Sequence, residues 1–140
     1  RLGRALVIHD RDSHDDLVRI LLDELAGDGL PDVVIFHCFS GDAGLARVAA
    51  DHGWYVSFSG TVTFSNARGL HEAAPVVPRD RILVETDAPF LTPMPHRGRI
   101  NASYLVPLTA RRLAELRGED VDDLCDDLHA NTVRAFGDWA

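Results

Sequence analysis

The sequence is poor in cysteine, in long apolar runs and in positive charge. Its two cysteines, Cys38 and Cys125, are too few for a disulfide framework. The longest apolar run is too short to span a bilayer, and no signal-peptide core follows the charged start. These absences predict a cytoplasmic protein with no membrane partner. The net charge of −8 argues against a broad basic surface for nucleic acid, although a metal ion and a few local arginines could hold phosphates in a cleft.

The chain also lacks an initiating methionine, and its one methionine is Met94. The first strand-like run starts by Ala5, without the slack that is usual at a natural terminus. We therefore expect these 140 residues to be a piece of a longer protein. An apolar content of 46% and a charged content of 26% are those of a single soluble globular domain.

Apolar runs alternate with helical patterns along the chain, which is typical of repeated βα units on a parallel sheet. Four such units form either a small open sheet or half of an eight-stranded barrel, and an open sheet would leave two bare edges. The sequence therefore predicts an α/β fold. The expected strands are 5–9, 33–37, 54–59 and 82–86, and the expected helices are 12–27, 42–52, a short one near 66, 107–117 and 121–136.

Apolar spacing also predicts which faces of the helices are buried. The first helix carries a leucine stripe at helical spacing, and we expect this stripe to pack against the sheet. Asn131, in the last helix, is interpreted as an ordinary polar residue of that helix. The stripe of the first helix consists of Leu17, Leu21 and Leu25, with Val18 and Leu22 beside them.

Three of the predicted strands end in residues that can bind a metal: His9, His37 and, just past the fourth, Asp87. A single histidine at a strand end is more often a hydrogen-bonded loop residue, but a core gains nothing from repeating the pattern three times. Imidazole and carboxylate together suit a hydrolytic metal site with room for a water. Glu85 alternates with Asp87 and shares its side of the strand. It either tunes the site or pairs with a basic side chain, and we favour the pairing.

Basic residues near these strand ends are candidates for substrate binding. Arg11 lies two residues past His9 and can face the same edge, where a guanidinium would bind phosphate in bidentate fashion. A salt bridge to a neighbouring acid is an equal alternative. His96, Arg97 and Arg99 form a local basic cluster in the loop after the fourth strand. Cys38 should face away from His37 along the strand, which favours packing over ligation.

Several motifs, in order along nearly the whole chain, resemble the TatD-related deoxyribonucleases. These motifs are 8–11 (IHDR), 37–41 (HCFSG), 59–64 (SGTVTF), 85–91 (ETDAPFL) and 96–98 (HRG) followed by Asn101. The resemblance implies a (β/α)8 TIM barrel and a divalent-metal phosphodiesterase, commonly a DNase with 3′→5′ exonuclease behaviour. It implies His9 and His37 as metal ligands on barrel strands five and six, and Asp87 as a ligand and catalytic base on strand eight.

The resemblance is incomplete in ways that suggest half of a barrel. The family's other metal residues, a His-x-His pair on the first strand and a Glu on the fourth, have no counterpart here. We therefore expect residues 1–140 to be the C-terminal part of one hydrolase barrel domain, with strands five to eight. A complete site would hold one or two divalent ions (Mg, Mn or Zn). The loop after strand eight reads Ile-Asn-Ala-Ser at 100–103, where the family has Arg-Asn-Glu-Pro.

Three functions remain open from the sequence. The first is hydrolysis of DNA phosphodiesters by a metal-activated water. The second keeps the barrel but changes the substrate to another ester or an amide. The third is a non-catalytic half-barrel that pairs with the missing N-terminal half or with a second copy of the chain. In each case we expect the isolated fragment to be inactive, oligomeric or prone to aggregate.

Overall fold

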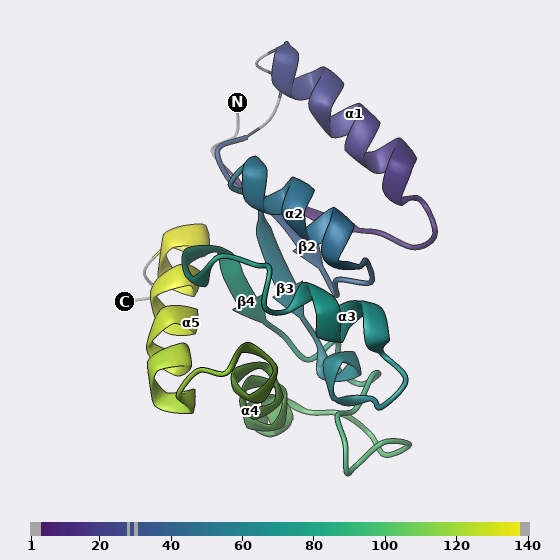
Figure 1. The fold of residues 1–140 in the computed structure, drawn as a ribbon, viewed down its shortest axis with the longest axis vertical. Helices are drawn as coiled ribbons and strands as arrows, with labels where there is room; N and C mark the ends of the chain where they lie inside the picture. Colours follow the sequence, from purple (N-terminus) through teal and green to yellow (C-terminus); the bar gives the residue numbers. More distant parts are fainter. Residues whose placement is uncertain (1–3, 28, 30, 138–140) are drawn as a thin grey trace.

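The structure is a computed structural model that describes residues 4–27, 29 and 31–137. Four parallel strands form one sheet in the order β1-β2-β3-β4, and each is followed by helical segments (Figure 1). The predicted α/β fold with a parallel sheet is confirmed. The strands are β1 (Leu6–His9), β2 (Val34–His37), β3 (Tyr55–Phe58) and β4 (Ile82–Val84).

The helices begin and end at residues suited to helix termini. Asp42 accepts hydrogen bonds from the backbone of Gly44 and Leu45, which lowers the pKa of its carboxyl. At the other end of a helix, Gly118 takes a left-handed conformation with φ +65°. The helices are α1 (His14–Ala26), α2 (Ala43–Asp51), α3 (Arg68–Ala73), α4 (Val106–Arg117) and α5 (Val121–Phe136), with short 3₁₀ segments η1 (Gly60–Thr63), η2 (Arg79–Arg81) and η3 (Ser103–Leu105).

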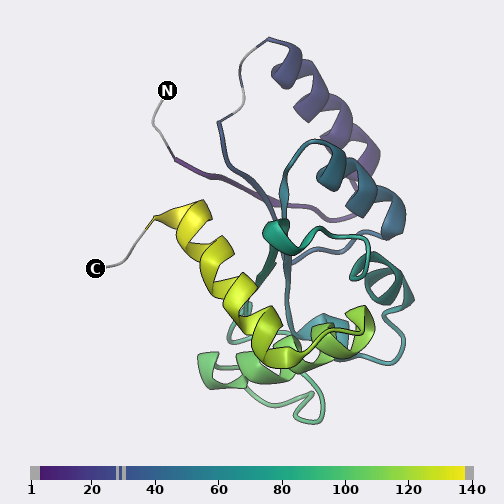
Figure 2. The ribbon, with the colours of Figure 1, turned by 60° about the vertical axis from the view of Figure 1, so that its left-hand side comes forward.

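The two faces of the sheet have different environments. On one face, Phe36, Val56 and Ile82 lie in register across β2, β3 and β4 and are fully buried against the helices. The other face carries Tyr55 and Leu83, which pack with Ile35 and with Ala135 of α5. Figure 2 shows α1, α2 and α3 together on one side of the strands, with α5 on the other side of the view. This second face leads to the polar residues at the strand ends.

Alternation of side chains places a polar row at the carboxyl ends of the strands. His9 and His37 are in register across β1 and β2, and Ser57 follows on β3. The fourth strand ends at Val84, two residues earlier than predicted. Even so, the amide of Glu85 donates to the carbonyl of Phe58 at 3.0 Å, so Glu85 continues the ladder. It lies on the same face as Ser57, two residues beyond Leu83, the register partner of Ser57.

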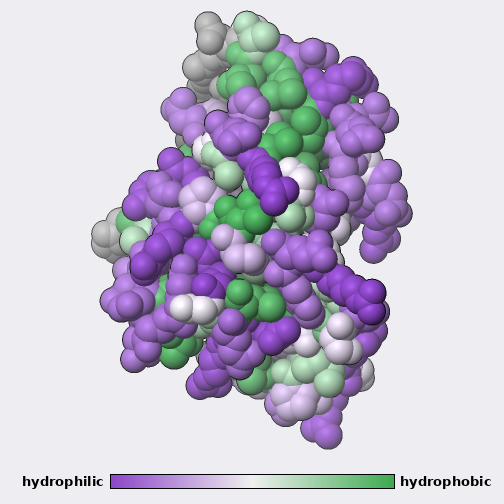
Figure 3. All heavy atoms as spheres, viewed as in Figure 1, coloured by the Kyte–Doolittle hydropathy of each residue, from purple (hydrophilic) through white to green (hydrophobic). Residues whose placement is uncertain are grey.

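The predicted stripe of α1 is only partly buried. Leu21 is 4% exposed, whereas Leu22 and Leu25 are 37% and 44% exposed. The reason is that α1 flanks β1, the edge strand, which has a neighbour on one side only. Figure 3 shows the resulting apolar surface along α1, on the side toward α2.

Asn131 is not an ordinary polar residue of α5, and that prediction is wrong. It is 1% exposed, and its side-chain amide donates to the carbonyls of Arg79 and Ile82 at 2.7 and 2.9 Å. It therefore ties α5 to the segment that enters β4. Within the described residues, no helix has the length and apolar character needed to cross a membrane.

Candidate functional site

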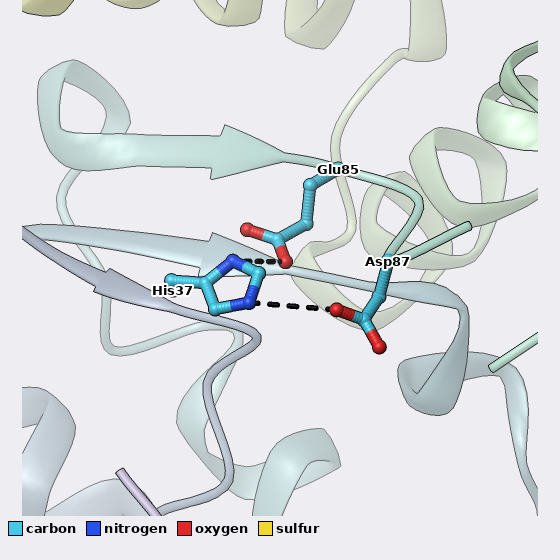
Figure 4. Close-up of side chains that lie close together, drawn as sticks. All are labelled: His37, Glu85 and Asp87. Atoms are coloured by element: carbon cyan, nitrogen blue, oxygen red, sulfur yellow. Dashed lines mark ion pairs between the residues drawn. The ribbon is translucent and has the colours of Figure 1, made fainter. Parts of the chain in front are cut away.

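His37, Glu85 and Asp87 form a compact polar group at the carboxyl ends of β2 and β4 (Figure 4). One ring nitrogen of the histidine, Nδ1, lies 2.7 Å from Oε1 of Glu85, and the other, Nε2, lies 3.4 Å from Oδ1 of Asp87. Ligand atoms of all three residues lie within 4.8 Å of one another. The side chains are 31%, 19% and 31% exposed, so the group opens to solvent on one side.

This group fits a divalent cation. Oε1 of Glu85 is buried and accepts no hydrogen bond from the described residues, because its contact with His37 lacks hydrogen-bond geometry. A buried carboxylate oxygen without a donor is costly unless a positive charge offsets it. Imidazole nitrogen and carboxylate oxygen are ligands suited to zinc, manganese or magnesium. The three residues therefore supply suitable ligand atoms, and a cation would offset the charge on Oε1 of Glu85.

The loop after β4 positions Asp87 in this group. Asp87 has φ +57°, a left-handed conformation that is unusual outside glycine. Asn101 holds this loop from inside. It is 3% exposed, and its amide nitrogen donates to the carbonyls of Thr86 and Phe90 at 2.6 and 2.7 Å. These bonds fix the backbone on both sides of Asp87.

Replacing Asn101 with Ala should destabilise the loop that carries Asp87. The substitution removes both donors and leaves two carbonyls short of a partner, at about 1–3 kcal/mol in the free energy of unfolding. Urea denaturation measures this cost, and titration with Mn²⁺ should show weaker cation binding. Ser103→Ala, at a nearby exposed position, is the control and should change neither quantity. Cation affinity at the level of the unsubstituted chain would show that Asn101 does not position Asp87.

His9 lies beside this group rather than within it. Its ring centroid is 5.8 Å from that of His37, and its side chain is exposed. It lines a cavity of about 740 Å³ together with Asp87 and Arg11. The structure thus brings His37 and Asp87 together with Glu85, and it places His9 in the lining of the cavity that Asp87 also lines.

The predicted basic residues take different positions. Arg11 lines the cavity, although β1 ends at His9 and the chain bends before it. Among the described residues that line this cavity, His96, Arg97 and Arg99 are absent. The guanidinium of Arg97 instead lies over the ring of Phe64, 4.3 Å from its centroid.

Cys38 does not continue the strand as predicted. β2 ends at His37, and Cys38 turns with φ +45° so that it lines the cavity. Burial raises the pKa of its thiol, the contact with Ser59 at 3.3 Å opposes this rise, and the charge of Glu85 adds to it. Together these effects raise the pKa of the Cys38 thiol.

Sequence reasoning favoured a basic partner for Glu85 without naming it, and it missed two further residues of the cavity. That partner is His37, and alternation along the strand had already placed Glu85 on the same side as Asp87. Asn66 and Arg68, from the start of α3, also line the cavity. They stand 29 and 31 positions along the chain from His37, and no local pattern marked them.

Comparison with known proteins shows which protein family this chain matches. A family model described as TatD related DNase matches residues 1–137. "Uncharacterized metal-dependent hydrolase TatD" of Mycobacterium tuberculosis is 48% identical over 137 residues, which cover 98% of this chain and 50% of that protein. "Uncharacterized metal-dependent hydrolase YcfH" of Escherichia coli K12 is 42% identical over 135 residues, covering 96% and 50%. The chain spans about half the length of the curated relatives it matches.

Solved structures show the same fold. The crystal structure of YJJV, a TatD homologue from Escherichia coli K12, has a TM-score of 0.82 at 26% identity. The match covers 94% of this chain and 49% of that one. An uncharacterised amidohydrolase from Saccharomyces cerevisiae has a TM-score of 0.75 at 15% identity, covering 94% and 53%, which is a likeness of fold alone.

Proposed function

Because the chain belongs to the TatD-related DNase family, we propose that it carries part of the active site of a metal-dependent hydrolase that cleaves phosphodiester bonds of DNA. The observation that carries this proposal is the group of His37, Glu85 and Asp87, whose ligand atoms lie within 4.8 Å of one another. A divalent cation bound there would activate a water for attack and offset charge on the phosphate.

Each residue near the strand ends has a role in this proposal. Asp87 is a cation ligand and also accepts the proton of the attacking water, since its carboxylate lines the cavity. His37 and His9 supply imidazole ligands. Arg11, in the same cavity, binds a phosphate oxygen.

The basic residues of the loop after β4 have a second role in the proposal. His96, Arg97 and Arg99 contact the DNA strand outside the cavity. The ring of Phe64 supports this role, because it lies under the Arg97 guanidinium and holds that charge in place. Contacts of this kind add affinity without selecting a sequence.

We propose that the chain forms strands five to eight of an eight-stranded barrel. In the described part of the chain, β1 and β4 each pair with one strand only, and Val7 of β1 is 52% exposed. Unpaired parallel edges attract further strands. The partner is the other half of the barrel or a second copy of this chain, and the chain by itself is inactive.

A chimera tests the function. Residues 1–137 would be joined to the half of the M. tuberculosis relative that they do not match. We expect the chimera to degrade end-labelled DNA with Mg²⁺ or Mn²⁺, and the 140-residue chain alone to be inactive and larger than a monomer by light scattering. A folded, metal-loaded chimera that leaves DNA intact would contradict the phosphodiesterase proposal and favour another ester or an amide. A monomeric and active 140-residue chain would contradict the pairing.

A further inference from the structure

The cavity beside Asp87 extends well beyond the candidate cation ligands. Its lining includes the loop after β1, the loop after β2, the start of α3 and the loop after β4. Its volume of about 740 Å³ lies in the range of small-molecule sites and exceeds what a cation and a water need. The lining also includes Asn66 and Arg68, for which the proposed chemistry has no use.

Two arginines in this cavity are available to an anion. Arg11 comes from the loop after β1, and Arg68 is the first residue of α3. In the part of the chain that the structure describes, neither guanidinium forms an ion pair. Five other arginines do form such pairs with carboxylates: Arg19, Arg79, Arg81, Arg112 and Arg117. A guanidinium in a cavity without a protein carboxylate is suited to bidentate binding of phosphate.

The acidic residues of the cavity do not cancel this charge. Asp10 is 6% exposed, and its carboxylate is occupied by Ser13 at 2.9 Å and by His14. Burial would raise the pKa of Asp10, but these two partners outweigh it and lower the pKa. Asp87 belongs to the candidate cation group, so Asp12 is the one remaining carboxylate among the described residues of the lining.

An exposed aromatic ring completes the cavity. Phe90 follows Asp87 by three residues, lines the cavity and is 68% exposed. Exposure of this kind has no packing benefit, and it places a flat apolar face beside the cation group and the two arginines. Base–aromatic stacking uses such a face.

We infer that this cavity is a nucleotide-binding subsite for the strand next to the cleaved bond. Arg68, with the side-chain amide of Asn66, binds the neighbouring phosphate, and Phe90 stacks on an unpaired base. The inference rests on the proposed function and adds to it two residues, Arg68 and Phe90, that make a strand extending past the cleaved bond bind more tightly than a small phosphodiester. Arg68 and Phe90 are therefore residues that determine specificity.

Binding of a short thymidine oligonucleotide tests the subsite. We would measure it by fluorescence anisotropy on the 140-residue chain and on the chimera, with a chelator present to prevent cleavage. Arg68→Gln should weaken binding about 10- to 100-fold and lower the slope of log affinity against log salt by about 0.7. Arg111→Gln removes the same charge from an exposed position of α4 outside the cavity and should do neither. Equal salt slopes for the two variants would overturn the phosphate contact.

Substitutions of Phe90 separate stacking from packing. Phe90→Leu keeps apolar bulk but loses the ring, and it should weaken binding about 5- to 100-fold. Phe90→Trp should retain binding, and neither substitution should change the salt slope. Equal affinity of the Leu and Trp variants would overturn the stacking.

The small substrate bis(p-nitrophenyl) phosphate distinguishes failure of the subsite from failure of the function. In the chimera, Arg68→Gln should raise KM for the oligonucleotide about 10-fold or more and leave turnover of the small substrate unchanged. Equal effects on both substrates would overturn the subsite while the hydrolase stands. A chimera that binds the oligonucleotide through Arg68 but cleaves neither substrate would overturn the hydrolase and leave the subsite.

Discussion

Asp87→Asn in the chimera should lower the rate of DNA cleavage by about 10³-fold, because one substitution removes both the proposed cation ligand and the proposed proton acceptor. The amide keeps the size of the side chain, so the loop held by Asn101 should persist and the protein should stay folded. Single-turnover cleavage of labelled DNA measures the effect. Asp51→Asn, at an exposed position at the end of α2, is the matched control and should keep the full rate.

Cation binding gives this prediction a second measurement. Asp87→Asn and His37→Ala should each lower the Mn²⁺ content of the dialysed protein, and a chelator should abolish cleavage by the unsubstituted chimera. Glu85→Gln has the same size but less charge, and it should also lower the metal content because Oε1 of Glu85 has no hydrogen-bond donor among the described residues. If Asp87→Asn retained cleavage within 10-fold of the unsubstituted rate, the assignment of Asp87 would be wrong.

The parts of the fold that were predicted correctly are those whose signal is local. Each strand is a short apolar run, and the helix expected at 42–52 is α2, where Asp42 accepts hydrogen bonds from amides two and three residues away. Gly118 ends α4 because it reaches a positive φ without strain. Such features are visible within a few residues of sequence. The burial of the α1 stripe is not visible in the local sequence, because it depends on whether β1 lies at the edge of the sheet.

In the candidate site, too, the features with a local sequence signal were predicted and those that depend on packing were not. Alternation along the chain placed Glu85 beside Asp87, but the contact of Glu85 with His37 joins residues 48 positions apart. Cys38 has a left-handed backbone conformation, and no local sequence pattern predicts it. Arg68 lines the cavity because α3, which packs against α2, begins beside the loops that follow the strands. Contacts between distant segments follow from packing, and the local pattern carries little of that information.

Asn131 illustrates how much a contact between distant segments contributes to the free energy of unfolding. Its amide donates to the carbonyls of Arg79 and Ile82, and its own oxygen accepts from Arg134 at 2.6 Å. Asn131→Ala should lower the free energy of unfolding by about 2–4 kcal/mol, since it leaves buried carbonyls without donors and opens a small cavity between α5 and β4. Urea denaturation followed by circular dichroism measures this loss.

Asn131→Asp separates the lost hydrogen bonds from the lost volume. The carboxyl has nearly the same shape as the amide but cannot donate once ionised. Burial at 1% exposure and the two facing carbonyls should outweigh the Arg134 guanidinium and raise its pKa above the value of about 3.9 in the unfolded chain. The unfolded chain then releases the proton first, so stability falls as pH rises from about 4 toward 7. Asp126→Asn, at an exposed position of the same helix, should show no comparable dependence. A pH-independent Asn131→Asp variant as stable as the unsubstituted chain would mean that α5 is held to β4 by apolar packing alone.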